Sequence, residues 1–133
     1  LNTKLDPLSS SNLLLFLTGP LTGTEYPTSG RMVVVTKSPL TNLYTDSHAG
    51  GYFGPELRKV GYDGIIIKGV SDEPVYLWIH DDKVEFRDAK NIWGLTIDET
   101  VIKIRKETDE KAHIASIGPA GENLVKYASI HID

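Results

Sequence analysis

Short runs of apolar and β-branched residues alternate with Gly- and Pro-rich segments along this chain, and most of the segments between the runs are short. Such runs are typical of β-strands. Parallel strands need a crossover connection of about a dozen residues or more, usually a helix, which most of these segments cannot supply. The sequence therefore predicts an α+β fold with mostly antiparallel sheets. The expected strands are residues 12–19, 31–37, 63–69, 112–118 and 125–133, with a hairpin over 73–88.

One or two short helices are expected beside these strands. PELRKV (55–60) predicts one or two helical turns that stop at Gly61. Residues 96–109 carry apolar side chains at helical spacing, and Thr96 stands three residues before Glu99, the pattern of a capping box. The polar segment between the second expected strand and the first expected helix, residues 38–54, is expected to form a long loop.

Composition narrows the classes of function. With 133 residues the chain is expected to form one domain, 1–133. It has no cysteine, which excludes a thiolate nucleophile and a cysteine-ligated zinc or iron–sulfur site within it. Its net charge is −4 and its basic residues are dispersed, so the sequence shows no basic patch that would bind nucleic acid or an anionic membrane. The longest strongly apolar run, 13–17, is too short to span a bilayer. A cytoplasmic location is expected. The chain opens on Leu-Asn-Thr without a signal peptide and reads as a fragment of a larger protein.

The stretch DSHAGGYFGPELRK (46–59) contains the most suggestive loop. AGGYFG within it is a degenerate dinucleotide fingerprint, with Asp72 about where a ribose-binding acid would fall. The strand directly before the glycines and the full crossover helix after them are missing, which disfavours nicotinamide or flavin. A tight turn remains open. So does an anion site, because consecutive small residues expose backbone N–H groups ahead of a helix start.

Two further positions could contact a ligand. Arg31 follows Gly30 at the entry to an apolar strand, and a guanidinium suits phosphate or a heteroaromatic edge. The alternative is a solvated arginine at a strand end. IGPAGEN (117–123) could aim backbone amides and the polar tips of Glu122 and Asn123 at a ligand, or form a strand-to-helix corner. The four histidines show no metal-ligand spacing.

Taken together, these segments resemble the N-terminal domain of the tungsten-containing aldehyde ferredoxin oxidoreductases. The resemblance runs in order over nearly the whole chain and is carried by TGPLTGT (18–24), SGRMVVVTKSPLTN (29–42), DSHAGGYFGPELRKVGYDGIIIKG (46–69), PVYLWI (74–79), the DA..IWG pattern from Asp88 to Gly94, and IGPAGENLVKYASI (117–130). It implies a base plate of two β-sheets. It also implies that the full protein oxidises aldehydes to carboxylic acids at tungsten, sometimes molybdenum, held by two pterin cofactors. Electrons then pass through a [4Fe–4S] cluster to ferredoxin.

The resemblance also implies roles for individual residues. Arg31 matches an arginine that contacts the cofactor. His48 takes a position whose backbone carbonyl helps to bind a magnesium ion between the two pterin phosphates; the family often has Asn here, and a carbonyl ligand tolerates the change. Ala49, Gly50 and Gly51 match the loop whose backbone lies against the phosphates. A second loop near the cofactor is matched by Gly121, Glu122 and Asn123.

The cluster cysteines and the acid/base residues implied by the resemblance would lie on other domains of the same protein. The isolated 133-residue chain is therefore expected to be inactive. The alternative is a stand-alone scaffold domain that docks on a separate catalytic subunit. Both hypotheses predict exposed apolar surface on one sheet, and both leave a homo-oligomer open.

Overall fold

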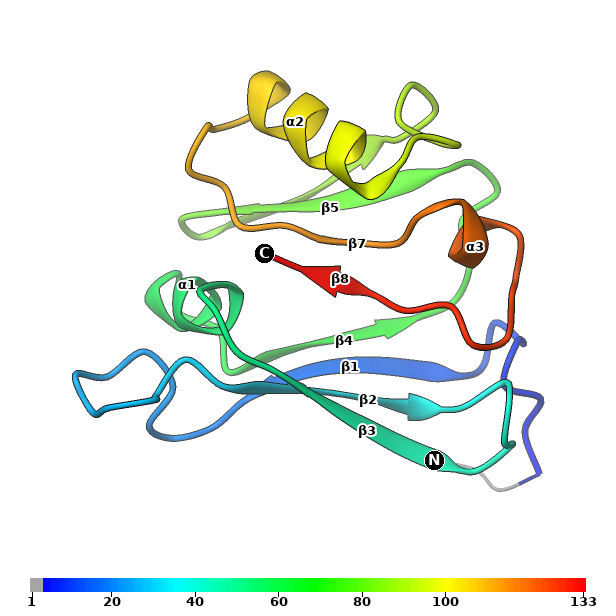
Figure 1. Cartoon of the computed structure of the whole chain (residues 1–133), viewed down its shortest axis with the longest axis horizontal. Helices are drawn as coiled ribbons and strands as arrows, with labels where there is room; N and C mark the ends of the chain where they lie inside the picture. Colours follow the sequence, from blue (N-terminus) through cyan, green and yellow to red (C-terminus); the bar gives the residue numbers. More distant parts are fainter. Residues whose placement is uncertain (1–3) are drawn as a thin grey trace. The chain divides into compact units, whose positions relative to one another are not determined.

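The computed structural model describes residues 4–133 and separates into two compact units (Figure 1). The first unit extends to Val70, and the second is Ser71–Asp133. The expectation of a single domain stays a prediction.

The first unit is built on a four-stranded antiparallel sheet with the strand order β3-β2-β1-β4. Its strands are β1 (Leu13–Thr18), β2 (Met32–Lys37), β3 (Tyr44–Ala49) and β4 (Gly64–Lys68). Phe16 in β1 lies opposite Val34 on one side and Ile65 on the other, so their side chains share one face. The predicted strands at 12–19, 31–37 and 63–69 are confirmed.

Helix α1 (Phe53–Lys59) covers the face of this sheet that carries Phe16. The rings of Phe16 and Phe53 lie 6.2 Å apart, and Leu57 of the helix is buried. Gly61, which follows the helix, has a φ of 92°. Few side chains tolerate that conformation, which explains the glycine at this position. The helix predicted at 55–60 is confirmed and starts two residues earlier.

The prediction of a loop throughout residues 38–54 was wrong, because β3 lies inside that segment. Its sequence, YTDSHA, shows no apolar alternation, and most of its residues are exposed. As the edge strand of the sheet, β3 is held by a backbone ladder to β2 rather than by side-chain burial. The hydrophobic pattern of the sequence therefore does not predict a strand of this kind.

The second unit contains the predicted hairpin and three short elements after the main helix. The hairpin is β5 (Val75–His80) and β6 (Lys83–Asp88), joined by Asp81-Asp82 with Asp81 at a φ of 53°. The remaining elements are α2 (Ile97–Glu107), β7 (Ala115–Ser116), α3 (Pro119–Glu122) and β8 (His131–Ile132). The core of the unit joins Ile104 of α2 to Ala89, Ile92 and Ile114, with Tyr76 of β5 packed against them.

The strands predicted at 112–118 and 125–133 are much shorter than expected, since β7 and β8 pair through only two residues each. Pro119 in the first turn of α3 ends the first of these runs. The described residues form three helices, whereas one or two were expected. The predicted α+β fold is confirmed.

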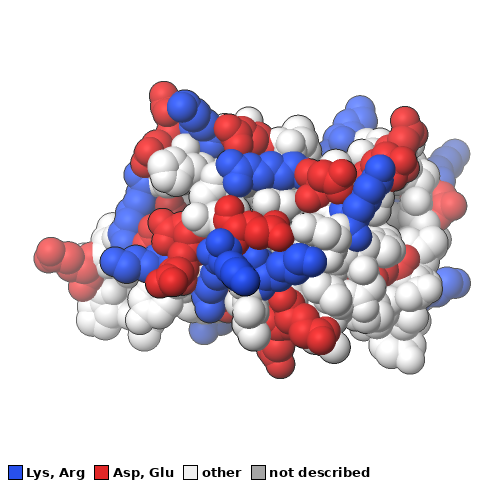
Figure 2. All heavy atoms as spheres, turned by 90° about the horizontal axis from the view of Figure 1, so that it is seen from above, with Lys and Arg blue, Asp and Glu red and all other residues white. Residues whose placement is uncertain are grey.

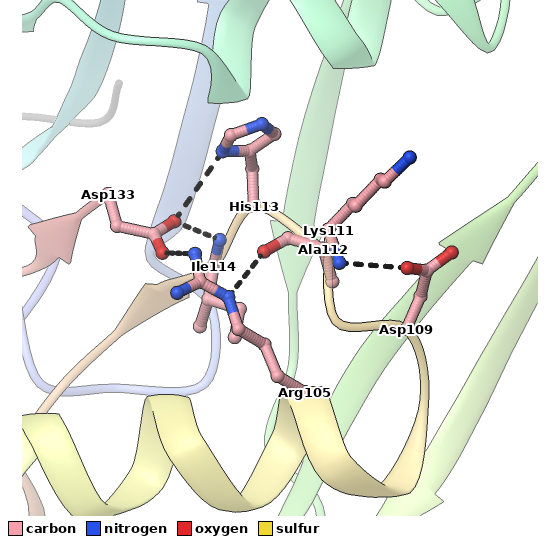
Figure 3. Close-up of polar contacts among 7 residues, drawn as sticks. All are labelled: Arg105, Asp109, Lys111, Ala112, His113, Ile114 and Asp133. Carbon is pink, nitrogen blue, oxygen red and sulfur yellow. Dashed lines mark hydrogen bonds and ion pairs between the residues drawn. The ribbon is translucent and has the colours of Figure 1, made fainter.

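A polar cluster joins Asp133, which follows β8, to α2 and to the segment that precedes β7 (Figure 3). The Arg105 guanidinium pairs with the Asp133 carboxylate and donates from Nε to the Ala112 carbonyl at 3.0 Å. The other Asp133 oxygen accepts the Ile114 amide at 2.6 Å and lies 3.9 Å from His113 Nδ1. Because the Asp133 side chain is only 19% exposed, these partners compensate a largely desolvated charge.

Helix α2 begins with the predicted capping box. Thr96 Oγ1 accepts from the Glu99 amide at 3.4 Å, and the Glu99 carboxylate accepts from the Thr96 amide at 2.9 Å. The bonds from the Thr96 backbone and hydroxyl hold the pKa of Glu99 below its usual value. A lowered pKa stabilises the folded state at neutral pH, and the contribution is lost as the pH falls through the lowered pKa.

Replacing Thr96 with alanine is expected to destabilise α2 by about 1 kcal/mol at neutral pH, because the cap bond is lost. The difference from wild type should shrink in acid as Glu99 is protonated. Hydrogen exchange of peptides from 97–107 in the purified protein measures this, and Thr96→Ser is the control that keeps the hydroxyl. Equal exchange in the alanine and serine variants would contradict the role of the cap.

Charged side chains are interspersed by sign on the face shown in Figure 2, where acidic and basic groups lie next to one another. No helix in the described part of the chain is long and apolar enough to cross a membrane.

Candidate functional site

The register of β2 and β3 brings Arg31 close to the glycine loop. Met32 lies opposite Ala49 in this ladder, so the entry to β2 and the exit from β3 are neighbours. A Cβ added to Gly30 would stand 2.6 Å from the carbonyl oxygen of Gly51. The two segments therefore approach each other backbone to backbone, at a distance that no side chain on Gly30 allows.

Thr22 was not predicted as a site residue from the sequence. It holds the loop between β1 and β2 against the backbone of Arg31, where β2 begins. Its hydroxyl donates to the Arg31 carbonyl and accepts from the Gly19 amide, both at 2.9 Å, and the residue is buried. A Cβ on Gly54, at the start of α1, would lie 3.3 Å from the Thr22 methyl. The only sequence signal was a threonine inside a Gly-Pro turn segment, where hydroxyls often bond to nearby backbone.

An open pocket of about 280 Å³ lies in this loop beside Arg31. It is lined by Gly19, Pro20, Leu21, Thr22, Tyr26, Pro27, Thr28, Ser29 and Arg31. Within residues 4–133, the structure gives the exposed Arg31 guanidinium neither a hydrogen bond nor an ion pair. A cation beside apolar and aromatic walls suits a planar ligand that carries an anionic group.

Within the glycine loop, Gly50 and Gly51 differ. Gly51 has a φ of 86°, which explains glycine there by backbone conformation. A Cβ on Gly50 would meet no atom within 4 Å, so open space adjoins the backbone at that position. The packing of the protein itself does not require glycine at Gly50. That open space fits the hypothesis that a ligand approaches the main chain there.

His48 and Ala49 end β3. The imidazole Nε2 of His48 lies 3.3 Å from the Asp46 carboxylate, and both side chains are about half exposed. The His48 side chain therefore has a partner on its own strand, and the metal contact expected of its backbone carbonyl stays a prediction. Among residues 4–133 no group of three or more His, Asp or Glu side chains is placed to hold a metal ion.

The second predicted loop lies in the other unit, around α3. The Glu122 carboxylate accepts from the Gly94 amide at 3.0 and 2.9 Å, and Asn123 Nδ2 donates to the Pro119 carbonyl at 2.7 Å. A Cβ on Gly121 would stand 2.9 Å from that of Ile117. All three residues thus have roles within their own unit, and their contact with a cofactor stays a prediction.

The sequence model of the family described as "Aldehyde ferredoxin oxidoreductase, N-terminal domain" matches residues 1–133. Tungsten-containing aldehyde ferredoxin oxidoreductases of Pyrococcus furiosus and Thermococcus kodakarensis are each 54% identical over all of this chain. A relative from P. furiosus described as "Aliphatic sulfonate oxidoreductase, WOR-like subunit" is 43% identical over 96% of it. The chain spans 22% of the length of each of these relatives.

A solved structure has the same fold. A chain of the active-site complex BamBC of benzoyl coenzyme A reductase, in complex with 1,5-dienoyl-CoA, is 46% identical with a TM-score of 0.95. The match covers 98% of this chain and 20% of that one. The family match over residues 1–133 and the relatives at 54% identity agree with the resemblance drawn from the sequence, and this chain belongs to the family of aldehyde ferredoxin oxidoreductase N-terminal domains.

Proposed function

We propose that this chain is the cofactor-binding N-terminal part of a tungsten-containing aldehyde ferredoxin oxidoreductase. The full protein would oxidise aldehydes to carboxylic acids at a bis-pterin centre of tungsten or molybdenum. Electrons would leave through a [4Fe–4S] cluster on another domain to ferredoxin. A cytoplasmic location is part of the same proposal. The observation that supports it most is the close approach of Gly30 to the Gly51 carbonyl, which places the glycine loop near Arg31 and its open pocket in a chain of this family.

The residues present fit a cofactor with phosphate groups and a planar ring system. Arg31 carries an exposed cation with no partner in the described residues and would bind an anionic or heteroaromatic edge. Gly50 leaves its main chain accessible, so Ala49, Gly50 and Gly51 would lie against the phosphates. The carbonyl of His48 would contribute to a magnesium ion, which prefers oxygen ligands. Gly121, Glu122 and Asn123 would form the second contact loop.

When bound, the tungsten pterin supplies the redox chemistry. This chain's contribution is to position it and to balance its charge. The close approach of Gly30 to Gly51 keeps Arg31 beside the loop, and Thr22 fixes the Arg31 backbone. Rigid placement of this kind is what a binding site requires of its supporting residues.

The test is an activity assay on the purified full-length protein. We expect reduction of ferredoxin, or of a viologen dye, that depends on added aldehyde and yields the carboxylic acid. If the protein holds tungsten but reduces neither acceptor with any aldehyde, the substrate part of the proposal is wrong. Activity that appears only after a second polypeptide is added would favour the scaffold alternative.

A further inference from the structure

One wall of the pocket beside Arg31 is a tight turn whose backbone conformation does not suit its residue. Residues 26–29, Tyr-Pro-Thr-Ser, form this turn, and all four line the pocket. The Ser29 amide donates to the Tyr26 carbonyl at 3.3 Å. Pro27 fixes its own φ at about −65°, and Thr28 follows with a φ of 64°. This geometry fits a type II turn, whose third residue needs a positive φ and is usually glycine or asparagine.

Thr28 is unfavourable in this conformation, because a β-branched side chain crowds the backbone when φ is positive. The other non-glycine residues with positive φ among residues 4–133 are Asn42, Asp81 and Leu124. Asn and Asp tolerate the left-handed region. Leu124 stands one residue beyond the C-cap of α3, a position at which helices often end in this conformation. Neither explanation applies to Thr28. Glycine would form the same turn without strain, so the turn itself does not require the Thr28 side chain.

The hydroxyl groups of the pocket differ in what they bind. Thr22 Oγ1 donates to the Arg31 carbonyl at 2.9 Å. Ser29 Oγ donates to the Thr24 carbonyl at 2.6 Å. These two hydroxyls therefore hold the loop together. Thr28 differs from both, since its hydroxyl makes no hydrogen bond within residues 4–133 and lines the same pocket as the Arg31 side chain.

We propose that the Thr28 hydroxyl donates a hydrogen bond to a phosphate oxygen of the ligand that Arg31 binds, and that the unfavourable backbone of Thr28 holds it in place to do so. The inference rests on the proposed function for the identity of that ligand, a cofactor with phosphate groups. A hydroxyl and a guanidinium in one pocket both donate to an anion. Residues in sparsely populated backbone conformations gather at ligand sites, where the surrounding structure maintains the strain.

Equilibrium dialysis with radiolabelled inorganic phosphate tests this on the full-length protein, purified from cells that cannot make pterin. Thr28→Val keeps the branched shape and removes the hydroxyl. It is expected to weaken phosphate binding roughly tenfold, because a hydrogen bond to a charged group is lost. Thr28→Ser keeps the hydroxyl and should bind nearly as well as wild type. Thr41→Val is the matched control, since Thr41 is exposed between β2 and β3 and does not line the pocket.

Thr28→Gly separates the role of the backbone from that of the side chain. Glycine adopts a φ of 64° without strain, so this variant should fold at least as stably as wild type and still bind phosphate as weakly as Thr28→Val. Hydrogen exchange of residues 21–31, measured without phosphate, reports the stability of the loop. We expect equal exchange in wild type and Thr28→Val, because the hydroxyl makes no bond within the described residues.

Three results would overturn the inference. Equal phosphate affinity in wild type, Thr28→Val and Thr28→Gly would show that Thr28 is a turn residue only. Faster exchange in Thr28→Val without phosphate would show that the hydroxyl bonds to another part of the protein. A wild type that binds no phosphate would leave the hydroxyl without its ligand.

Tungsten and pterin, measured on protein from cells that do make pterin, keep this inference apart from the proposed function. A protein without metal or pterin, whose phosphate affinity falls in Thr28→Val, contradicts only the proposed function. A protein that holds tungsten and pterin, with the same phosphate affinity in wild type and Thr28→Val, contradicts only the role of Thr28.

Discussion

Replacing Gly30 with alanine is expected to disrupt the candidate site. The new Cβ would lie 2.6 Å from the Gly51 carbonyl oxygen, so one of the two backbones must move. Forcing atoms into a packed position costs about 1–3 kcal/mol. In the full-length protein we expect a several-fold loss of bound tungsten and faster hydrogen exchange in residues 30–36 and 44–54.

Gly50→Ala is the comparison for that variant. Its Cβ would meet no atom within 4 Å, and its backbone φ is not in the positive region. Hydrogen exchange in the same segments should therefore match wild type. Any tungsten lost from Gly50→Ala would report a contact with the cofactor rather than a change of fold. Wild-type exchange and tungsten content in Gly30→Ala would refute the close approach of the two segments.

Replacing Arg31 with alanine is expected to lower the tungsten and pterin content without unfolding the protein. Hydrogen bonds to charged groups contribute about 1.5–3 kcal/mol, which corresponds to a roughly tenfold to hundredfold loss of affinity. The Arg31 side chain is exposed and has no partner in the described part of the chain, so its removal should leave stability nearly unchanged. Metal analysis together with a thermal unfolding curve of the full-length variant measures both effects.

Lys68→Ala is the control, because Lys68 is an exposed cation at the end of β4. Arg31→Lys should retain part of the cofactor, since it keeps the charge and loses the planar fork. Equal tungsten occupancy in wild type and Arg31→Ala would show that Arg31 does not bind the cofactor.

Much of the fold could be predicted because its strands and main helix follow simple patterns. LLLFLT, MVVVTK and the hairpin carry their own apolar signals, and Thr96 with Glu99 marks the start of α2. β3 was missed because an exposed edge strand depends on backbone pairing with β2, which no local pattern records. β7 and β8 were overestimated because apolar content alone does not show where pairing stops.

The site was predictable in its residue types but not in its geometry. Arg31 and the glycine pair stand out by their chemistry, whereas their proximity depends on the register of two strands. The importance of Gly30 and Thr22 lies in contacts with segments distant in sequence. Glu122 was singled out as a polar tip for a ligand, yet its carboxylate binds the Gly94 amide, a contact that spacing does not reveal.

The relatives of this chain are described with different activities. Proteins 43–54% identical to this chain are described as acting on aldehydes or on an aliphatic sulfonate, and a 46% identical chain belongs to a benzoyl coenzyme A reductase complex. Proteins that share this N-terminal fold are thus described with several different activities.

If this chain helps to hold a tungsten pterin cofactor, the full-length protein contains both the metal and the pterin. The most direct test measures metal and pterin in the full-length protein, purified from cells grown with tungstate, by elemental analysis and by fluorescence of the oxidised pterin. We expect tungsten or molybdenum together with two pterins for each metal atom. A fully folded protein that contains neither metal nor pterin would contradict it.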